Sequence, residues 1–441
     1  MSGIIETKYG PVEGVARDGC TCYLGIPFAK APIGELMFRH PLPPEPWKDV
    51  LKADHGSCNP IQEQGGFAIG NNSQDCLYLN VFAPEHRDGP LPVMVWTYGG
   101  SYSQGGAGAE LPGTTQLQYD LTRFARETGC VVVSFNYRLN LYGFLNLHFL
   151  DESFEQNNGL YDQIMALRFV RDNIAAFGGD PENVTLFGQS AGGACILALM
   201  AMPEAEGLFH KAIVQSACIE HFFTEEESRA HTKAYLRLAG VKAARELLSL
   251  PPQKVMDTNR KYAAWLLRKG DIRCAFSPVI DGVTLREAPK ETAKRSSIPL
   301  LIGNVSQEAN LFLHAIPAAA LPLAARFLRL KVPKGSGSYR QRLSDALTTH
   351  IYVRPQLEIL NEYAGKASRY VYHYAFPGST MGCFHTCELP VLFGMNSAII
   401  GNADDPESER IGTEMRKLWG QFAKEGRVHW HPGEAGMAIV E

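Results

Sequence analysis

Residues 183–193 read NVTLFGQSAGG, and the apolar run ACILALM follows at positions 194–200. The residues before the first glycine are typical of a buried strand, and the run after the last glycine is typical of an apolar helix. Gly188-Gln189-Ser190-Ala191-Gly192 therefore fits the G-x-S-x-G pattern in the context it requires, a sharp strand-to-helix turn. Glycines tolerate the tight backbone around the serine, and the helix N-terminus favours developing negative charge. The stretch predicts a nucleophilic Ser190; a glycine-serine turn without chemistry is the alternative.

The segments on both sides of this turn alternate between strand and helix patterns. LPVMVWTYGG at 91–100, which ends in turn residues, and CVVVSFNYR at 130–138 are apolar strand runs, whereas 162–178 has apolar residues near helical spacing and ends at Gly178. This alternation implies βαβ units and a mostly parallel sheet. Further strands are expected at 77–84, 211–217, 299–303 and 369–376, and further helices near 115–128, over 222–270 and at 408–425.

These elements predict one α/β domain over residues 1–441, with a mostly parallel central sheet flanked by helices. The Gly- and Pro-rich segment 1–60 indicates a small antiparallel N-terminal portion. Helical insertions around 222–270 and 308–350 are expected to surround a substrate site. The sequence has no internal repeat and no linker long enough to separate two folding units.

Composition and charge exclude several classes of partner. A formal net charge of −4 without a basic run gives no reason to expect nucleic acid or an anionic membrane surface. The longest apolar stretch, 311–328, contains His314, Arg326 and two prolines, which argues against a membrane span. The segment MSGIIETKYG lacks the features of a secretory signal, so a cytoplasmic location and reduced cysteines are expected. No oligomeric state is predicted.

A second glycine-containing loop, TYGGSY at Thr97–Tyr102, directly follows the strand residues PVMVW at 92–96. Esterases with this kind of nucleophile turn bind an oxyanion with backbone N–H groups from such a loop and from the residue after the serine. The predicted donors are Gly100, Ser101 and Ala191. An ordinary glycine-rich loop is the alternative, but its place before the nucleophile turn favours the oxyanion function.

A nucleophilic serine needs a base, and the base needs an acid that orients it. With this turn the expected order along the chain is serine, acid, histidine. Glu308 comes just after an apparent strand, and His385 lies in the loop GCFHTCELP after the strand expected at 369–376. His373 falls inside that strand and is interpreted as a sheet side chain. Glu308 and His385 are therefore the predicted acid and general base.

Two other histidine patterns compete with this interpretation. Cys383, His385 and Cys387 have a spacing that resembles metal ligands, but a fourth ligand is not nearby in the sequence. His429-Trp430-His431 near the C-terminus is interpreted as a solvated turn. No metal or cofactor is predicted.

Taken together, these residues resemble the type-B carboxylesterases, the family that contains cholinesterases and bacterial para-nitrobenzyl esterases. The resemblance covers nearly the whole chain, and several motifs in order are more specific than any one. The motifs are Tyr23–Ala29 (YLGIPFA), Gln74–Val81 (QDCLYLNV), Asn173–Gly193 (NIAAFGGDPENVTLFGQSAGG) and Glu388–Pro390 (ELP).

The resemblance implies an α/β-hydrolase fold and the activity of a serine esterase. It matches Ser216 to a serine that supports the acidic residue in this family. It assigns the triad to Ser190, Glu308 and His385, and the oxyanion donors to Gly100, Ser101 and Ala191.

The departures from the family pattern also carry information. Gln189 stands where relatives usually have Glu, and little change in mechanism is expected because this position does not transfer protons. Ser101 replaces the third glycine of the oxyanion loop, which keeps the N–H but narrows the pocket. Gly65–Phe67 has no tryptophan where cholinesterases stack one on choline, so acetylcholine is not the expected substrate. Cys58 and Cys76 match a pair that secreted relatives bridge; reduced thiols are expected here.

The sequence thus predicts a serine carboxylesterase that hydrolyses small-molecule esters through an acyl-enzyme on Ser190. A catalytically silent cholinesterase-like recognition or adhesion module is one alternative, but such a module would have lost a triad residue, and all three positions are filled. A lipase is another, based on the apolar stretch 311–325; it predicts a rate increase above the substrate's solubility limit.

Overall fold

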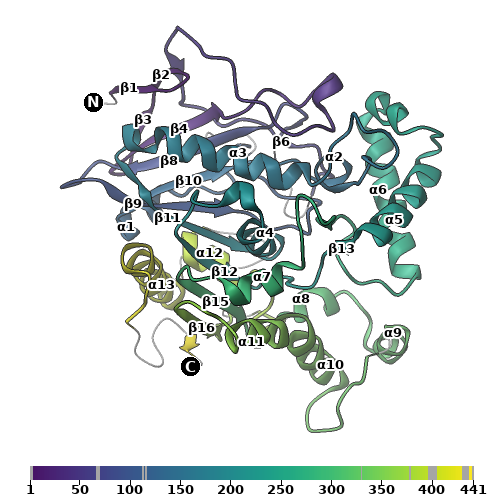
Figure 1. Ribbon diagram of the computed structural model, residues 1–441. Coiled ribbons are helices and arrows are strands. Elements are labelled where there is room, and N and C mark those ends of the chain that lie inside the picture. Colours follow the sequence, from purple (N-terminus) through teal and green to yellow (C-terminus); the bar gives the residue numbers. More distant parts are fainter. Residues whose placement is uncertain are drawn as a thin grey trace.

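The computed structural model describes residues 3–65, 70–111, 114, 117–328, 330–376, 379–395, 405–429 and 437–439. Within these ranges, ten strands form one central sheet that includes segments from both ends of the chain (Figure 1). In spatial order the strands are β17 (Met437–Ile439), β16 (Ala367–Tyr372), β15 (Leu300–Val305), β12 (Lys211–Gln215), β11 (Gly179–Gln189), β9 (Leu91–Thr97), β10 (Val131–Phe135), β8 (Tyr78–Pro84), β4 (Cys20–Pro27) and β3 (Val15–Arg17).

The middle of the sheet is parallel and its margins are antiparallel. The six strands from β16 to β10 pair in parallel, while β8, β4, β3 and β17 pair antiparallel with their neighbours. Every residue of β10 and β12 is buried, as expected for parallel strands covered on both faces. The mostly parallel sheet of the sequence prediction is confirmed.

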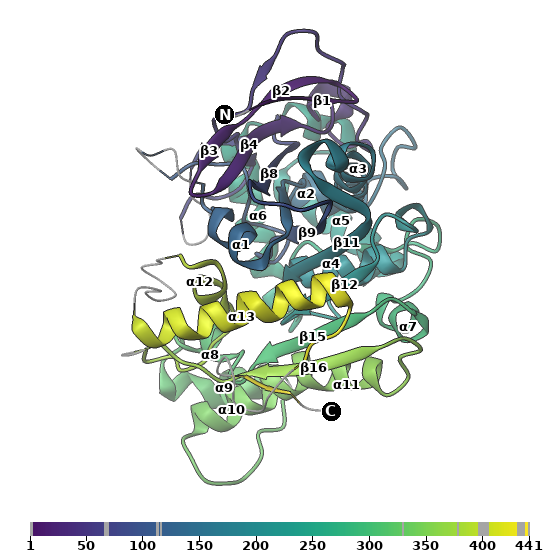
Figure 2. The same cartoon turned by 90° about the vertical axis from the view of Figure 1, so that its left-hand side faces the viewer.

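Helices cover both faces of this sheet, as the two views show (Figures 1 and 2). On one face, α4 contacts β9, β11 and β12, with α3 and α7 beside it. On the other face, α13 contacts β9 and β11 and packs on α1 and α12. The bounds are α1 (Thr122–Thr128), α3 (Asn158–Asn173), α4 (Ala191–Met200), α7 (Pro289–Arg295), α12 (Glu388–Phe393) and α13 (Pro406–Glu425).

A small sheet at the N-terminus confirms the antiparallel portion expected there. β1 (Ile4–Thr7) pairs antiparallel with β2 (Gly10–Glu13), and β5 (Leu51–Lys52) joins β2 in parallel. Two further short pairs are parallel: β6 (Asn59–Pro60) with β7 (Asn72–Ser73), and β13 (Phe223–Thr224) with β14 (Val279–Ile280).

The segments predicted as insertions are helical and lie on the same side of the molecule, the first above the second in the view of Figure 1. The first is α5 and α6, which pack on each other; α5 begins with a capping box of Thr224 and Glu227. The second rests on its own apolar cluster, which includes Leu313, Leu321 and Leu343. The helices are α5 (Glu225–Ala239), η4 (Ala244–Ser249), α6 (Pro252–Arg268), α8 (Asn310–Leu313), η5 (Ala318–Ala320), α9 (Leu321–Phe327), α10 (Tyr339–Thr348), η6 (Thr349–Val353) and α11 (Arg354–Leu360), and α2 (Asn140–Phe144) lies earlier in the chain.

The apolar stretch 311–328 consists of short helices: Pro317 precedes η5, and Pro322 lies in the first turn of α9. Among the described helices, none combines the length and apolar character that a bilayer crossing requires.

Several predicted boundaries differ from those in the structure. The strand expected at 369–376 ends at Tyr372, because its parallel partner β15 ends at Val305 in the same register, and His373 follows as an exposed residue. The helix expected near 115–128 begins at Thr122, and positions 115 and 116 lie outside the described residues. The helix expected at 162–178 is α3 followed by a 3₁₀ turn, which ends at Gly178 with φ of 87°.

Candidate active site

The predicted nucleophile lies on a strained turn between a strand and a helix. β11 ends at Gln189 and α4 begins at Ala191, so Ser190 alone joins them, with φ of 59°. A Cβ atom on Gly192 would lie only 2.1 Å from the carbonyl oxygen of Thr97, so no larger residue fits there. The strand-turn-helix context expected for G-x-S-x-G is present.

The side chains of Ser190, His385 and Glu308 form one hydrogen-bonded chain. His385 Nε2 lies 2.9 Å from Ser190 Oγ, and His385 Nδ1 lies 2.5 Å from Glu308 Oε2. The other carboxylate oxygen of Glu308 accepts a 2.9 Å bond from the backbone N–H of Val305. Glu308 is fully buried, while Ser190 is 6% exposed. The structure thus brings together three groups that lie nearly two hundred residues apart in sequence.

The sheet explains why these groups meet. Ser190, Glu308 and His385 follow the carboxyl ends of β11, β15 and β16, and parallel strands end at the same edge. Backbone hydrogen bonds between neighbouring strands align these ends. The N–H of Ser190 donates to the carbonyl oxygen of Gln215 at the end of β12, and the N–H of Ser216 donates to that of Gly303 in β15.

The environment of His385 favours its protonated form. Burial, the largest single influence, lowers its pKa, but the charge of Glu308 and its hydrogen bond raise it, and the pKa is held above the ordinary 6.5. Because Nδ1 faces the carboxylate, the neutral ring carries its proton there and presents the Nε2 lone pair to the hydroxyl of Ser190. This is the arrangement that a general base requires.

The loop after β9 packs directly against the nucleophile. A Cβ atom on Gly99 would lie 2.9 Å from Cβ of Ser190, and Gly100 takes a φ of 111° that favours glycine. Within the part of the chain that the structure describes, the backbone N–H groups of Gly100 and Ser101 have no hydrogen-bond acceptor. Ala191 is the first residue of α4, where a helix N–H has no partner inside the helix. These N–H groups are available to bind an oxyanion.

Ser216 does not support Glu308 through its hydroxyl in this structure. It lies one residue beyond β12 with φ of 48°, and its Oγ atom has no hydrogen-bond partner among the described atoms. The two hydrogen bonds of the Glu308 carboxylate come from Val305 and His385 instead. The structure gives Ser216 no side-chain hydrogen bond to Glu308, and its support of the acid stays a prediction.

The side chain of Gln189 contacts the catalytic centre, which the sequence did not indicate. Its Nε2 atom lies 3.2 Å from His385 Nε2, and the residue is buried. The amide of Gln189 is neutral, so Glu308 is the negative group that stabilises a positive charge on the imidazole. A glutamate at position 189, which the resemblance makes the usual residue, would add a second negative charge beside the ring.

Two aromatic rings form walls beside His385, and sequence reasoning missed both. Tyr352 and Phe312 have ring centroids 5.4 and 5.5 Å from that of His385. Tyr352 is buried, but Phe312 is 52% exposed and comes from the predicted insertion 308–350. Their position explains why an apolar segment follows the acid directly in sequence.

A second carboxyl group, that of Glu388, is buried close to the triad. Its Oε1 accepts a long 3.5 Å bond from Gln215 Nε2, and its Oε2 has no partner among the described residues. Burial and the nearby charge of Glu308 raise the pKa of Glu388 to about 7, from an ordinary 4.5. The group is therefore uncharged below neutral pH.

Replacing Glu388 with glutamine is expected to stabilise the fold at about pH 8 and to change little at about pH 4.5. The pKa of Glu388 is 4.5 in the unfolded chain and about 7 in the folded protein, so between pH 4.5 and 7 the folded state binds more protons at this carboxyl. The contribution of Glu388 to stability therefore falls as the pH rises towards 7. The shift corresponds to at most about 3 kcal/mol, which the neutral amide removes. Urea unfolding of Glu388→Gln and the parent at both pH values measures this; equal gains at the two pH values would contradict it.

The cysteines near the triad do not form the metal site considered from their spacing. Both ring nitrogens of His385 are engaged by Glu308 and Ser190. Cys383 Sγ lies 3.1 Å from the carbonyl oxygen of Tyr372 and 3.7 Å from Cys387 Sγ. The two thiols therefore pack under the histidine loop, and the histidine is committed to the serine.

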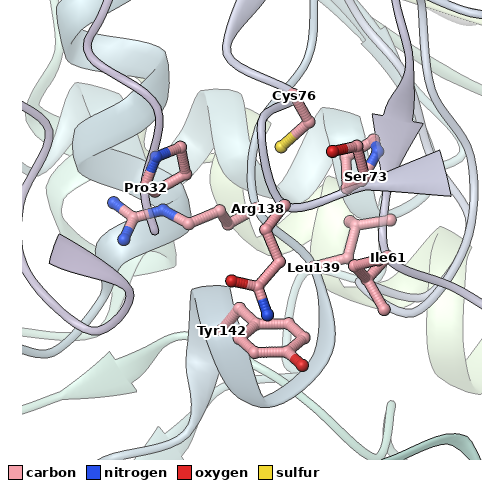
Figure 3. A pocket seen from close by; sticks show the side chains of 9 residues that line it. Pro32, Ile61, Ser73, Cys76, Arg138, Leu139 and Tyr142 are labelled. Carbon is pink, nitrogen blue, oxygen red and sulfur yellow. The ribbon is translucent and has the colours of Figure 1, made fainter. Parts of the chain in front are cut away.

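All ten cysteines lie in described segments and are free thiols. Cys76 is buried at a small cavity of about 10 Å³, whereas Cys58 is not among the lining residues (Figure 3). This volume holds about one water molecule and is far below that of a ligand pocket. The lining residues are Pro32, Pro60, Ile61, Ser73, Gln74, Cys76, Arg138, Leu139 and Tyr142.

Two remaining sequence interpretations fall partly outside the described residues. His429 is exposed and its Nε2 lies 3.2 Å from Glu425, but Trp430 and His431 lie beyond the described range. In the stretch Gly65–Phe67, on which the acetylcholine expectation depends, only Gly65 is described.

The known proteins to which this chain is similar are carboxylesterases and related esterases. The model of the carboxylesterase family matches residues 1–327. A para-nitrobenzyl esterase of Bacillus subtilis (strain 168) is 36% identical over 467 residues, which cover 97% of this chain and 92% of that protein. Carboxylesterase 4A of Bos taurus is 31% identical over 493 residues, covering 96% and 87%. A solved thermophilic PNB esterase matches with a TM-score of 0.85 at 31% identity, covering 100% of this chain and 98% of that one.

Proposed function

Because this chain belongs to the carboxylesterase family and is a serine carboxylesterase, we propose that it hydrolyses carboxylic esters with Ser190 as nucleophile, His385 as general base and Glu308 as the orienting acid. Its fold is the α/β-hydrolase fold. The observation that supports this assignment is the hydrogen-bonded chain from Ser190 Oγ through both ring nitrogens of His385 to Glu308.

Acylation begins when Ser190 Oγ attacks the ester carbonyl and its proton passes to His385 Nε2. The negative charge that develops on the carbonyl oxygen is bound by the N–H groups of Gly100, Ser101 and Ala191. The tetrahedral intermediate collapses, the bond to the alcohol breaks, and His385 returns the proton to the leaving oxygen. Glu308 stabilises the imidazolium in this interval without accepting the proton.

Deacylation repeats these steps with water in place of the serine. His385 takes a proton from water, which attacks the acyl carbon, and the acid product leaves as Ser190 regains its proton. The nucleophile, the base, the orienting acid and the oxyanion donors in this cycle are residues of the chain, and water and the ester are the two reactants.

The walls of the site support esters with an apolar or aromatic alcohol as substrates. His385 protonates the leaving alcohol, so that group must lie beside the rings of Tyr352 and Phe312. A related protein is named for para-nitrobenzyl esters, which carry an aromatic alcohol of this kind. We infer that para-nitrobenzyl esters are turned over faster than ethyl esters of the same acid.

A fluorophosphonate probe is expected to label one residue, Ser190. The Ser190 oxygen bonds to phosphorus, fluoride leaves, and the proton passes to His385. Peptide mapping by mass spectrometry identifies the modified residue. The matched control is Ser216→Ala, since Ser216 is a buried serine one residue beyond the neighbouring strand and its Oγ atom has no hydrogen-bond partner among the described atoms. Labelling should persist in the control and vanish in Ser190→Ala; an adduct on another serine would refute the assignment.

A further inference from the structure

Three side chains with soft donor atoms converge next to the active site. Cys218 Sγ, His221 Nδ1 or Nε2 and Cys274 Sγ all lie within 4.8 Å of one another. The Cys274 Sγ to His221 Nδ1 distance is 3.6 Å. None of these residues has a part in the ester hydrolysis described above.

The spacing of the three donor atoms is compatible with one bound metal ion, although the Cys274 to His221 distance is also that of a thiol hydrogen bond. With a Zn–S bond of about 2.3 Å, a Zn–N bond of about 2.05 Å and tetrahedral angles, sulfur and nitrogen ligands lie about 3.6 Å apart. The observed Cys274 to His221 separation equals this value. Two sulfurs on the same ion lie about 3.8 Å apart, within the spread of the cluster.

Rigid backbone presents two of these ligands. Cys218 follows β12 by three residues, and the backbone N–H of His221 donates to the carbonyl of Cys218 at 3.1 Å. This turn brings both side chains to the same side in a C-x-x-H spacing. Cys274 comes from the segment between α6 and β14, and the cluster therefore joins the sheet edge to the first helical insertion.

The cluster is sheltered but reachable from solvent. Cys218 is buried, Cys274 is 9% exposed, and His221 is partly exposed. Arg273, the neighbouring cation, is paired with both Asp271 and Glu227, so that these three groups sum to a negative charge. The net charge of Arg273, Asp271 and Glu227 therefore does not repel a divalent cation bound at the neighbouring Cys274.

We propose that Cys218, His221 and Cys274 bind a thiophilic divalent metal ion such as Zn²⁺, with a water molecule as the fourth ligand. Two thiolates and one imidazole are the donor set that Zn²⁺ prefers. Binding releases the thiol protons to solvent.

The site is joined to the catalytic groups by two contacts. The side chain of Ser101, an oxyanion-loop residue, lies beside Cys274. The hydroxyl of Tyr352 lies 3.9 Å from Cys218 Sγ, and the Tyr352 ring packs on His385. An ion bound to Cys218 and Cys274 engages the two sulfur atoms that lie beside Ser101 and Tyr352, and so it alters both the oxyanion loop and a wall of the site. The bound metal inhibits ester hydrolysis; this second claim rests on the proposed function, whereas binding does not.

The test of binding is a titration of the reduced, full-length chain with Co²⁺, followed by absorption. The expected result is one Co²⁺ per chain with a sulfur-to-cobalt charge-transfer band, which added Zn²⁺ removes. Loss of a residue that only supports a metal ligand weakens metal binding by about 10–100-fold. Cys274→Ser and His221→Ala each remove a ligand itself, so each should weaken binding by more than this. Cys58→Ser, which changes a more exposed thiol outside the cluster, should bind as the parent does.

Three outcomes would overturn the site: no charge-transfer band in the parent, an undiminished band in both cluster variants, or a Cys218–Cys274 disulfide that forms in place of metal binding. Circular dichroism of each variant verifies that it is folded. Inhibition is measured separately, as the activity of each variant with Zn²⁺ relative to its own metal-free activity. Binding without inhibition would refute only the coupling to the active site, and loss of activity without binding would refute the metal site.

Discussion

Replacement of Ser190 with alanine is expected to lower kcat for an activated ester by about 10⁴–10⁶ while the fold stays intact. The hydroxyl oxygen of Ser190 is the atom that forms the bond to the acyl group. Among the described residues, the other hydrogen-bonding contact of His385 Nε2 is the amide of Gln189, which cannot replace the serine as nucleophile. Residual activity comes from the oxyanion N–H groups and from substrate binding.

The measurement is a steady-state comparison on a para-nitrophenyl or para-nitrobenzyl ester, with circular dichroism to verify the fold. Ser216→Ala is again the matched control and should retain activity. Turnover near that of the parent in Ser190→Ala would contradict the assignment of the nucleophile. A burst of alcohol release in the parent, absent in the variant, would show the acyl-enzyme directly.

Glu308→Gln is expected to lower kcat by about 10⁴ and to move the acid limb of the pH profile to lower pH. In the parent, Glu308 holds the pKa of His385 above 6.5 against the effect of burial. The base must be neutral, so kcat/KM of the parent falls as pH drops through this raised pKa. Without the carboxylate, burial remains and lowers the pKa, and a larger fraction of the weakened enzyme stays neutral in acid.

The profile of kcat/KM between about pH 5 and 9 measures both effects. Glu388→Gln is the matched control, because it neutralises another buried carboxyl whose influence on His385 is the smallest of those found. It should move the acid limb less than Glu308→Gln does. A parent profile that is flat through this range, with chemistry rate-limiting, would refute His385 as the base.

The sequence predicted the parts of the site that depend on chain order and local pattern. Ser190 follows from residue types within a dozen positions, because a strand, a strained turn and a helix each leave a local signature. Glu308 and His385 follow from their places after strands, because the ends of parallel strands share an edge. The structure places the three side chains within hydrogen-bonding distance of one another, and their catalytic functions stay predictions.

The missed features depend on contacts between distant segments. Tyr352 and Phe312 reach His385 through helices whose packing has no signature in the local sequence. The end of the strand at Tyr372 is set by where its neighbour ends, not by the aromatic residues that continue the pattern. The orientation of Ser216 depends on a backbone φ of 48°, which residue type alone does not predict.

The separate apolar cluster under α8, α9 and α10 has an evolutionary consequence. Residues such as Leu313, Leu321 and Leu343 pack against one another in this insertion, in a cluster separate from the main core around the sheet. Its outward face, where Phe312 and Leu323 are exposed, is therefore free to vary while the strand ends that hold the triad keep their spacing. Selection for new ester preferences can act on this one module, and the melting temperature of the whole protein is largely spared.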